Sequence, residues 1–339
     1  MRYRITVSMT WLLIGCGTSA PVPSDAGLGN PDAVDLPDSG LALLDAGANS
    51  DAGFAPDAAP EDSGVSTATS GLALNHFYAV VDRETAQAIA TSAYLSDTFA
   101  AFAERTNSSG IRTWTGLYVF GHDTYIELFA PGAIGPAGNT GVAFAVETVG
   151  GIDAIAAEES ALGHHFTVSD QRFVPPEGGS IPWFHMGTHA PDPFHPPALF
   201  EWAMEYRPEY IAYVLNDQAH DPADIPRSAM LQRFYAPEKL MENIRALRFA
   251  MPVEARDGFG AAARSYGWRV RLEGETLTAE GPEITIVVVA DAVHRGLLEV
   301  QLALNRGIDT PLEVPIGTST LTVGPGRVAR WRFTPVNLP

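Results

Sequence analysis

The feature that most constrains the fold is an order of elements that occurs twice in succession. A strand, a helix and further strands are predicted over residues 71–135, a unit interpreted as β-α-β-β-β, and the same order returns over residues 138–206. Apolar residues alternate along the strands and recur every three to four positions in the helices, so each copy has one sheet face and one helix face to bury. Repeats of such a unit share a core, and the sequence therefore predicts an α+β fold of paired β-α-β-β-β modules.

Local patterns give the elements of each module. In the first, the predicted elements are an opening strand over 72–82, a helix over 83–105 with a break near 92–95, and strands over 112–121 and 124–130. In the second, they are a strand over 141–147, a helix over 151–163 that Gly163 ends, weaker strands over 166–174 and 180–187, and a closing strand over 197–206.

The rest of the chain is less regular. A helical insertion is predicted over 207–243, and a third, looser β-α-β-β-β-like unit with a C-terminal hairpin over 244–339. The stretch GFGAAA at 258–263 does not directly follow a strand, so we interpret it as a helix face of small residues. No nucleotide cofactor is expected.

Three strands carry a glutamate between large apolar residues, namely Glu127, Glu201 and Glu299. Burying a carboxylate costs several kcal/mol unless it is paired, protonated or bound to a cation. The opening strand LNHFYAVVD adds His76 to a run of apolar residues. Glu127 and Glu201 are therefore candidate site residues. Glu299 is interpreted as solvent-facing, because its unit has no histidine on the opening strand.

His76 in LNHFYAVVD, Glu127 in TYIELF and the FEW of the second module resemble the vicinal oxygen chelate superfamily, which includes glyoxalase I and extradiol dioxygenases. The resemblance covers 71–206 well and 245–305 weakly, and is nearest to glyoxalase-like bacterial families. It implies that the paired modules form an open curled sheet with a cleft. It also implies a divalent metal (Fe, Mn, Zn or Ni) held by His76, Glu127 and Glu201, with a position left for substrate.

The second module departs from the family pattern at its opening strand. Aligning Asp82 with Glu147 puts Gly141 opposite His76, and glycine offers no ligand. The stretch FHMGTHAPDPFHPP contains His185, His189 and His195, and any one of them is a candidate replacement for the missing ligand. His185 is also expected to line the ligand together with Tyr78 and Tyr125 of the first module. Alternatively, the small residues of the second opening strand leave room for a ligand without a metal.

Three functions therefore stay open. The first is a metal-dependent enzyme acting on a small oxygenated substrate, with the metal as Lewis acid. The second is a non-catalytic protein that binds a small molecule in the same cleft. The third is a structural lipoprotein whose cleft is vestigial.

The N-terminus predicts export and anchoring. Arg2 and Arg4 precede an apolar run that is too short to span a bilayer, and the run ends in LIGC. LIGC resembles a bacterial lipobox, which implies a signal peptide over residues 1–15 and a lipidated Cys16. The expected location is the cell envelope, at the outer membrane of a Gram-negative bacterium, with the membrane contacted only through this anchor.

Charge excludes one class of partner. Residues 17–70 contain nine acids and no Lys or Arg among Ala, Asp, Gly, Pro and Ser, which predicts a disordered acidic tether over 16–70. The whole chain has a formal net charge of −19 and shows no basic stripe. Since phosphate binding needs clustered Lys and Arg, a nucleic-acid partner is not expected.

Overall fold

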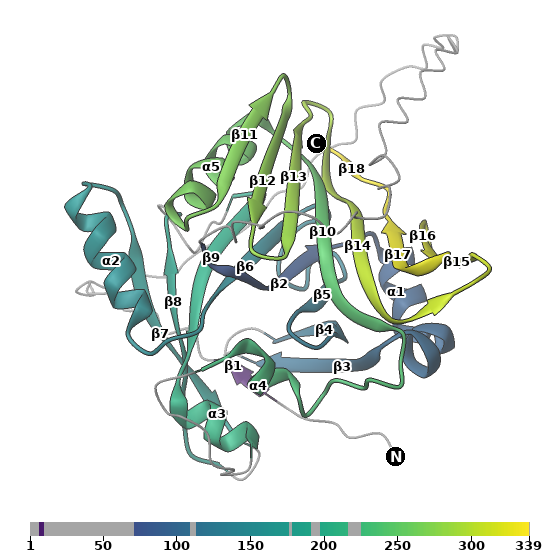
Figure 1. Cartoon of the computed structure of the whole chain (residues 1–339), viewed down its shortest axis with the longest axis horizontal. Coiled ribbons are helices and arrows are strands. Elements are labelled where there is room, and N and C mark those ends of the chain that lie inside the picture. Colours follow the sequence, from purple (N-terminus) through teal and green to yellow (C-terminus); the bar gives the residue numbers. More distant parts are fainter. Residues whose placement is uncertain are drawn as a thin grey trace, which may run out of the picture. The chain divides into compact units, whose positions relative to one another are not determined.

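The structure is a computed structural model that describes residues 7–9, 71–108, 113–175, 178–190, 197–215 and 225–338 (Figure 1). Cys16 and the predicted tether over 16–70 lie outside these residues. Within them, no helix is both long enough and apolar enough to cross a membrane.

The first module has the predicted order of elements with a shorter helix. Its elements are β2 (Ala73–Val80), α1 (Arg83–Thr91), a π-helical turn (Leu95–Phe99), β3 (Ala101–Ser108), β4 (Thr113–Phe120) and β5 (Tyr125–Phe129). The predicted break near 92–95 is confirmed at Ser92, and the chain is helical again up to Phe99, so the predicted helix over 83–105 is wrong only beyond Phe99. Ser92 takes an extended backbone conformation, and residues 101–108 pair along their length with β4. These sheet hydrogen bonds outweigh the helix preference of Ala and Glu.

The second module contains β6 (Thr140–Val146), α2 (Gly151–Ala161), β7 (Thr167–Val174), β8 (Ile181–Thr188) and β9 (Leu199–Tyr206).

The helix ends in both modules have local causes. The carboxylate of Asp82 caps α1 by accepting a hydrogen bond from the Thr85 N–H at 2.9 Å. Gly163 follows α2 with φ +76°, a left-handed conformation that glycine adopts without strain, so the predicted helix end is confirmed.

The two modules share one curled sheet with the strand order β3-β4-β5-β2-β6-β9-β8-β7. The opening strands β2 and β6 pair antiparallel at its centre, and each is parallel to the closing strand of its own module, β5 or β9. The predicted α+β fold of paired modules is confirmed. The short strand β1 (Val7–Met9) pairs with both edge strands, β3 and β7.

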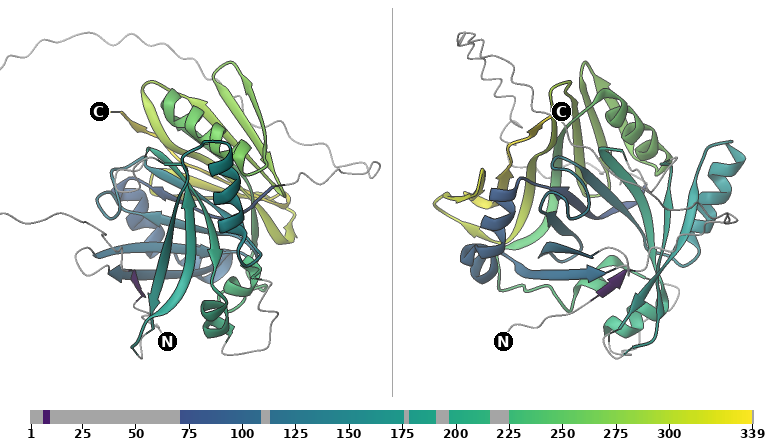
Figure 2. Two further views of the ribbon diagram at one scale, coloured as in Figure 1. Left: turned by 90° about the vertical axis from the view of Figure 1, so that its left-hand side faces the viewer. Right: turned by 180° about the vertical axis from the view of Figure 1, so that it is seen from behind.

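Residues 207–240 supply the helices α3 (Pro208–Leu215) and α4 (Arg227–Leu231). A second sheet follows (Figure 2, green to yellow). Its elements are β10 (Met241–Met251), α5 (Val253–Ser265), β11 (Arg269–Glu273), β12 (Thr276–Gly281), β13 (Ile284–Ala290), β14 (His294–Ile308), β15 (Leu312–Ile316), β16 (Ser319–Val323), β17 (Gly326–Arg332) and β18 (Val336–Asn337). Their order, β11-β12-β13-β10-β14-β17-β16-β15, repeats the pattern of the first sheet, with β18 added beside β14.

This topology changes the interpretation of Glu299. The closing strand of the third module is β13, which pairs parallel to β10, whereas Glu299 lies on β14, which opens the final group of strands. Glu299 is only 8% exposed, so its interpretation as solvent-facing is wrong. Arg332 Nε and Gln301 Nε2 each donate a hydrogen bond to its carboxylate at 3.1 Å, which compensates for burial.

The first sheet is covered on both faces. One face, with Phe77, Leu128 and Phe144, joins a core that also includes Phe249 and Trp268 of the third module. The other face, called the inner face below, builds a separate core with α3 and α4. The candidate site residues of the first module lie on this inner face.

Candidate functional site

The structure brings His76 and Glu127 together on the inner face. Across β2 and β5, His76 is opposite Tyr125, and Tyr78 is opposite Glu127. Alternation along a strand sends residues two apart to the same side, so all four side chains share that side. His76 Nε2 lies 3.9 Å from Glu127 Oε1. Tyr78 and Tyr125, the predicted ligand-lining tyrosines, flank this pair.

Glu201 is not brought to this pair. Across β6 and β9, Ala143 is opposite Trp202, while Glu201 is opposite Val142. Ala143 is in turn opposite His76, so Trp202 and not Glu201 shares the inner face with His76. The two ring centroids lie 5.2 Å apart. Because side chains alternate, an offset of one residue moves Glu201 to the other face of the sheet.

His185 is also on the other face of the sheet from His76. On β8 it is opposite Glu205 and Asp170, and its Nε2 lies 2.5 Å from Asp170 Oδ1. His195 lies outside the described residues. Among the residues that are described, no three His, Cys, Asp or Glu side chains form a group that could hold a metal ion.

The inner face therefore does not fit the metal centre that the resemblance implies. Such a centre draws ligands from the opening and closing strands of both modules. The first module offers His76 and Glu127, but the second offers Gly141 and Ala143 on β6 and Phe200 and Trp202 on β9. None of these four side chains is a metal ligand.

The space beside Gly141 is filled by aromatic rings. A Cβ at Gly141 would lie 2.2 Å from Tyr78 Cε1 and 2.9 Å from Trp202 Cζ3. The centroids of the Tyr78 and Trp202 rings are 5.9 Å apart. The small residue in β6 therefore lets the two aromatic side chains approach the backbone, and leaves no open space at this point.

His76 is a neutral imidazole with a defined tautomer. It is 5% exposed, and its Nδ1 lies 2.8 Å from Asn75 Oδ1. Burial lowers the pKa of His76 to about 3, so the ring carries one proton at neutral pH. Because Asn75 Oδ1 can only accept, that proton is on Nδ1. The lone pair of Nε2 then faces Glu127.

Glu127 is a protonated carboxyl group at neutral pH. Burial raises its pKa to about 8, against the opposing effects of the Arg105 charge and a hydrogen bond with Tyr125. Its side chain is 18% exposed, compared with 6% for that of His76. The pair therefore consists of a hydrogen-bond acceptor, His76 Nε2, and a carboxylic acid that is the more accessible of the two.

Aromatic rings surround the pair. The His76 ring stacks on Tyr125 with centroids 4.3 Å apart and an interplanar angle of 17°. Farther along the inner face, Phe234, which follows α4, stacks on Phe120 at 4.9 Å. The Arg105 guanidinium lies 4.4 Å from the Phe234 centroid. The helical insertion thus covers the inner face. The sequence predicts its helices but not which face of the sheet they cover.

Comparisons with solved structures give distant resemblances. A hypothetical protein from Staphylococcus aureus is 10% identical, with a TM-score of 0.47 over 75% of this chain and 99% of that chain. A Mn(II)-bound glyoxalase from Novosphingobium aromaticivorans is 12% identical, with a TM-score of 0.33 over 77% of this chain and 80% of that chain. BphC, a halotolerant catechol dioxygenase, is 9% identical, with a TM-score of 0.32 over 81% of this chain and 90% of that chain. Since these scores are below 0.5, the fold assignment rests on the strand order of the chain itself.

Comparisons at the level of sequence identify one family. No curated protein matches the chain. One family model matches residues 74–333, which run from β2 to just past β17 and include both sheets. The chain therefore belongs to DUF5829, a family of unknown function.

Proposed function

We propose that the chain binds a small, neutral, oxygen-bearing molecule at the His76–Glu127 pair. The observation that carries the proposal is the pairing of an Nε2 acceptor on a neutral imidazole with a protonated carboxyl group 3.9 Å away. A hydroxyl group of the ligand donates to Nε2, and a neighbouring carbonyl oxygen accepts from the Glu127 carboxyl group. At 3.9 Å the two groups are too far apart to bond directly to one another, so a ligand that bonds to both is favoured.

The surroundings favour a planar ligand. Tyr125, Tyr78 and Trp202 place aromatic rings around the pair, and rings of this kind pack against flat, apolar molecules. A charged ligand would lose its hydration without gaining an opposite charge at the pair, since both members are neutral at pH 7. The chemistry assigned to the ligand is therefore a hydroxyl group next to a carbonyl group, on or beside an aromatic ring.

The test uses α-hydroxyacetophenone as the probe and acetophenone, which lacks the hydroxyl group, as the matched compound. We expect the first to raise the thermal unfolding midpoint more than the second. His76→Phe removes the acceptor and keeps the ring, and Glu127→Met removes the donor. Each should weaken binding about 5- to 10-fold, the effect of one lost hydrogen bond. Glu127→Gln retains a donor and should bind nearly as the wild type does. Equal binding of both compounds, or no effect of either variant, would refute the proposal.

A catalytic use of the pair is favoured by one observation, the pKa of about 8 for Glu127. A carboxyl group with a pKa near the working pH can give and take a proton, whereas an ordinary carboxylate is too weak a base. The candidate reaction is proton removal from the carbon between the hydroxyl and carbonyl groups. Loss of that C–H signal of α-hydroxyacetophenone in D₂O, faster with wild type than with Glu127→Gln, would support it. Equal rates would exclude it.

The location is part of the same proposal: Cys16 is lipidated and anchors the chain in the cell envelope. LIGC after a short apolar run supports it. Expressed in a Gram-negative host with an alkyne-tagged fatty acid, the wild-type chain and the control Ser19→Ala should be labelled and enter a detergent phase. Cys16→Ser should do neither. Label retained by Cys16→Ser, or an unlabelled wild type, would contradict the anchor.

A further inference from the structure

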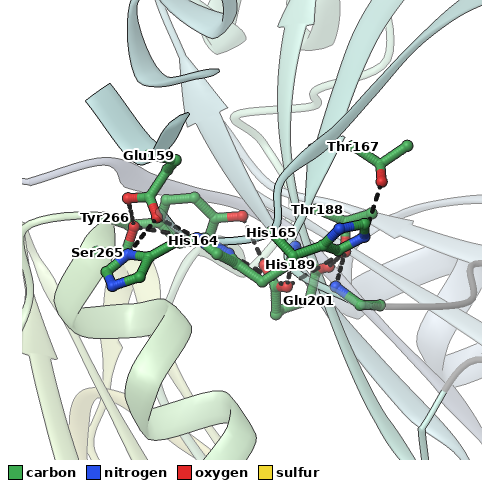
Figure 3. A network of polar contacts seen from close by, with 10 residues as sticks. Glu159, His164, His165, Thr167, Thr188, His189, Glu201, Ser265 and Tyr266 are labelled. Atoms are coloured by element: carbon green, nitrogen blue, oxygen red, sulfur yellow. Dashed lines mark hydrogen bonds and ion pairs between the residues drawn. The ribbon is translucent and has the colours of Figure 1, made fainter. Parts of the chain in front are cut away.

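A second polar cluster lies where module two contacts the end of α5 (Figure 3). Its centre is His189, which follows β8. His189 Nε2 lies 3.3 Å from Glu159 Oε2 of α2 and 3.1 Å from Ser265 Oγ of α5. Its Nδ1 lies 3.5 Å from Glu201 Oε1 of β9. One imidazole ring thus stands between carboxylates of two elements of module two and beside the last turn of a third-module helix.

The other hydrogen bonds of the cluster fix what His189 faces. Ser265 donates its hydroxyl proton to Glu159 Oε1, so the oxygen of Ser265 is left to accept. The Tyr266 hydroxyl donates a hydrogen bond to Glu201 Oε2 at 2.6 Å, and the backbone N–H of His189 donates one to Glu201 Oε1 at 2.9 Å. Both ring nitrogens of His189 therefore face acceptors. Two acceptor-facing nitrogens suit the doubly protonated, positively charged ring.

Burial makes that charge necessary. The side chains of Glu159 and Glu201 are 3% and 7% exposed, and that of His189 is 18% exposed. Two carboxylates held this deeply without a cation between them would repel one another with little screening by water. The cluster is outside the His76–Glu127 pair and is not used by the proposed function.

We propose that protonated His189 is a clamp that holds α2 and β9 of module two to the C-terminal end of α5, and that loss of its proton releases α5. Glu201 and Trp202 are neighbours on β9 and face opposite sides, so the clamp also supports, from outside, the strand that presents Trp202 to His76.

The electrostatics agree in direction. Burial acts to lower the pKa of His189, but the carboxylate of Glu201, 3.5 Å from Nδ1, and that of Glu159 outweigh burial and raise the pKa above 6.5. A histidine with a raised folded-state pKa stabilises the junction fully below pH 6.5 and loses this effect as pH rises through the raised value. Burial acts to raise the pKa of Glu159, but its bonds with Ser265, His164 and His189 lower it overall, so acid also weakens the clamp.

Other groups also face the clamp. His164 lies at the surface after α2, with Nδ1 2.8 Å from Glu159 Oε2. The Tyr266 hydroxyl stays protonated, because burial and the charge of Glu201 raise its pKa well above 10. The rings of Phe166 and Tyr266 pack against the His189 ring at 4.9 and 5.2 Å. His165, with Nε2 3.1 Å from Thr167 Oγ1, provides a nearby control.

The test follows the His189 ring by NMR during a pH titration of the full chain. We expect its midpoint above 6.5 in the wild type and in His165→Gln, and a lower midpoint in both Glu159→Gln and Glu201→Gln. A wild-type midpoint at or below 6.5, or one that neither glutamate variant lowers, would overturn the proposal.

Hydrogen exchange tests the release itself. Protection of the last turn of α5, corrected for intrinsic exchange, should fall between pH 6 and pH 9 by about tenfold for each pH unit by which the His189 midpoint exceeds 6.5. His189→Gln should show weak protection of this turn at both pH 6 and pH 9. His165→Gln should show the same fall in protection as the wild type. Equal protection of the wild type at pH 6 and pH 9 would refute the clamp without bearing on ligand binding at His76.

Discussion

Glu127→Gln is expected to stabilise the folded chain at pH 9 by on the order of 4 kcal/mol and to change its stability little at pH 5. Glu127 has a pKa of about 8 in the folded chain, raised from an unfolded value of 4.5. An acid raised in this way stabilises the folded state fully below pH 4.5, and the effect is lost as pH rises towards 8. A tenfold change in a protonation equilibrium corresponds to about 1.4 kcal/mol. Glutamine has no charge to bury, so the variant avoids the loss.

The measurement is urea unfolding of wild type and variant at pH 5, 7 and 9. Glu104→Gln is the matched control, because Glu104 is an exposed glutamate on β3, which β4 separates from β5 in the same sheet. Its difference from wild type should stay within about 0.5 kcal/mol at each pH, as is usual for surface substitutions. Parallel pH profiles for wild type and Glu127→Gln would show that Glu127 is ionised in the folded chain, and would remove the donor on which the proposed ligand depends.

Trp202→Ala is expected to destabilise the chain by about 3–5 kcal/mol, the usual cost of removing a large buried aromatic side chain. Trp202 is 7% exposed, and its ring lies 5.2 Å from that of His76 and 5.3 Å from that of Phe200. Urea unfolding at pH 7 measures the loss. Indole, which matches the removed group, should raise the unfolding midpoint of the variant and not that of the wild type.

Glu201→Gln is the control for the Trp202→Ala experiment, because Glu201 is adjacent to Trp202 in β9 and lies on the opposite face of the sheet. It should leave indole without effect, because no cavity forms on the inner face. A loss below about 1 kcal/mol in Trp202→Ala would mean that Glu201, one residue away, and not Trp202, faces His76. The register of β9 would then have to be shifted by one residue.

Much of the fold could be predicted because its signals are local. Alternating apolar residues and the end signals at Asp82 and Gly163 lie within a few positions of the elements that they define. The helix predicted over 83–105 failed where the signal was not local. Residues 101–105 have helix-forming composition, and only the pairing of 101–108 with β4, about ten residues further along the chain, makes them part of a strand.

The sequence by itself determined the paired β-α-β-β-β modules and two members of the site, His76 and Glu127. It could not determine which face of β9 carries Glu201. The strand does alternate Phe200, Trp202, Met204 and Tyr206 with Glu201, Ala203 and Glu205, but every residue of β9 is buried, so the alternation does not say which of its two covered faces meets His76. Only the pairing of β9 with β6 settled this, by placing Trp202 beside Ala143 and Glu201 beside Val142. The tertiary structure thus brought two of the three expected ligands, His76 and Glu127, together and placed Glu201 on the other face, because a one-residue register decides which side chains meet.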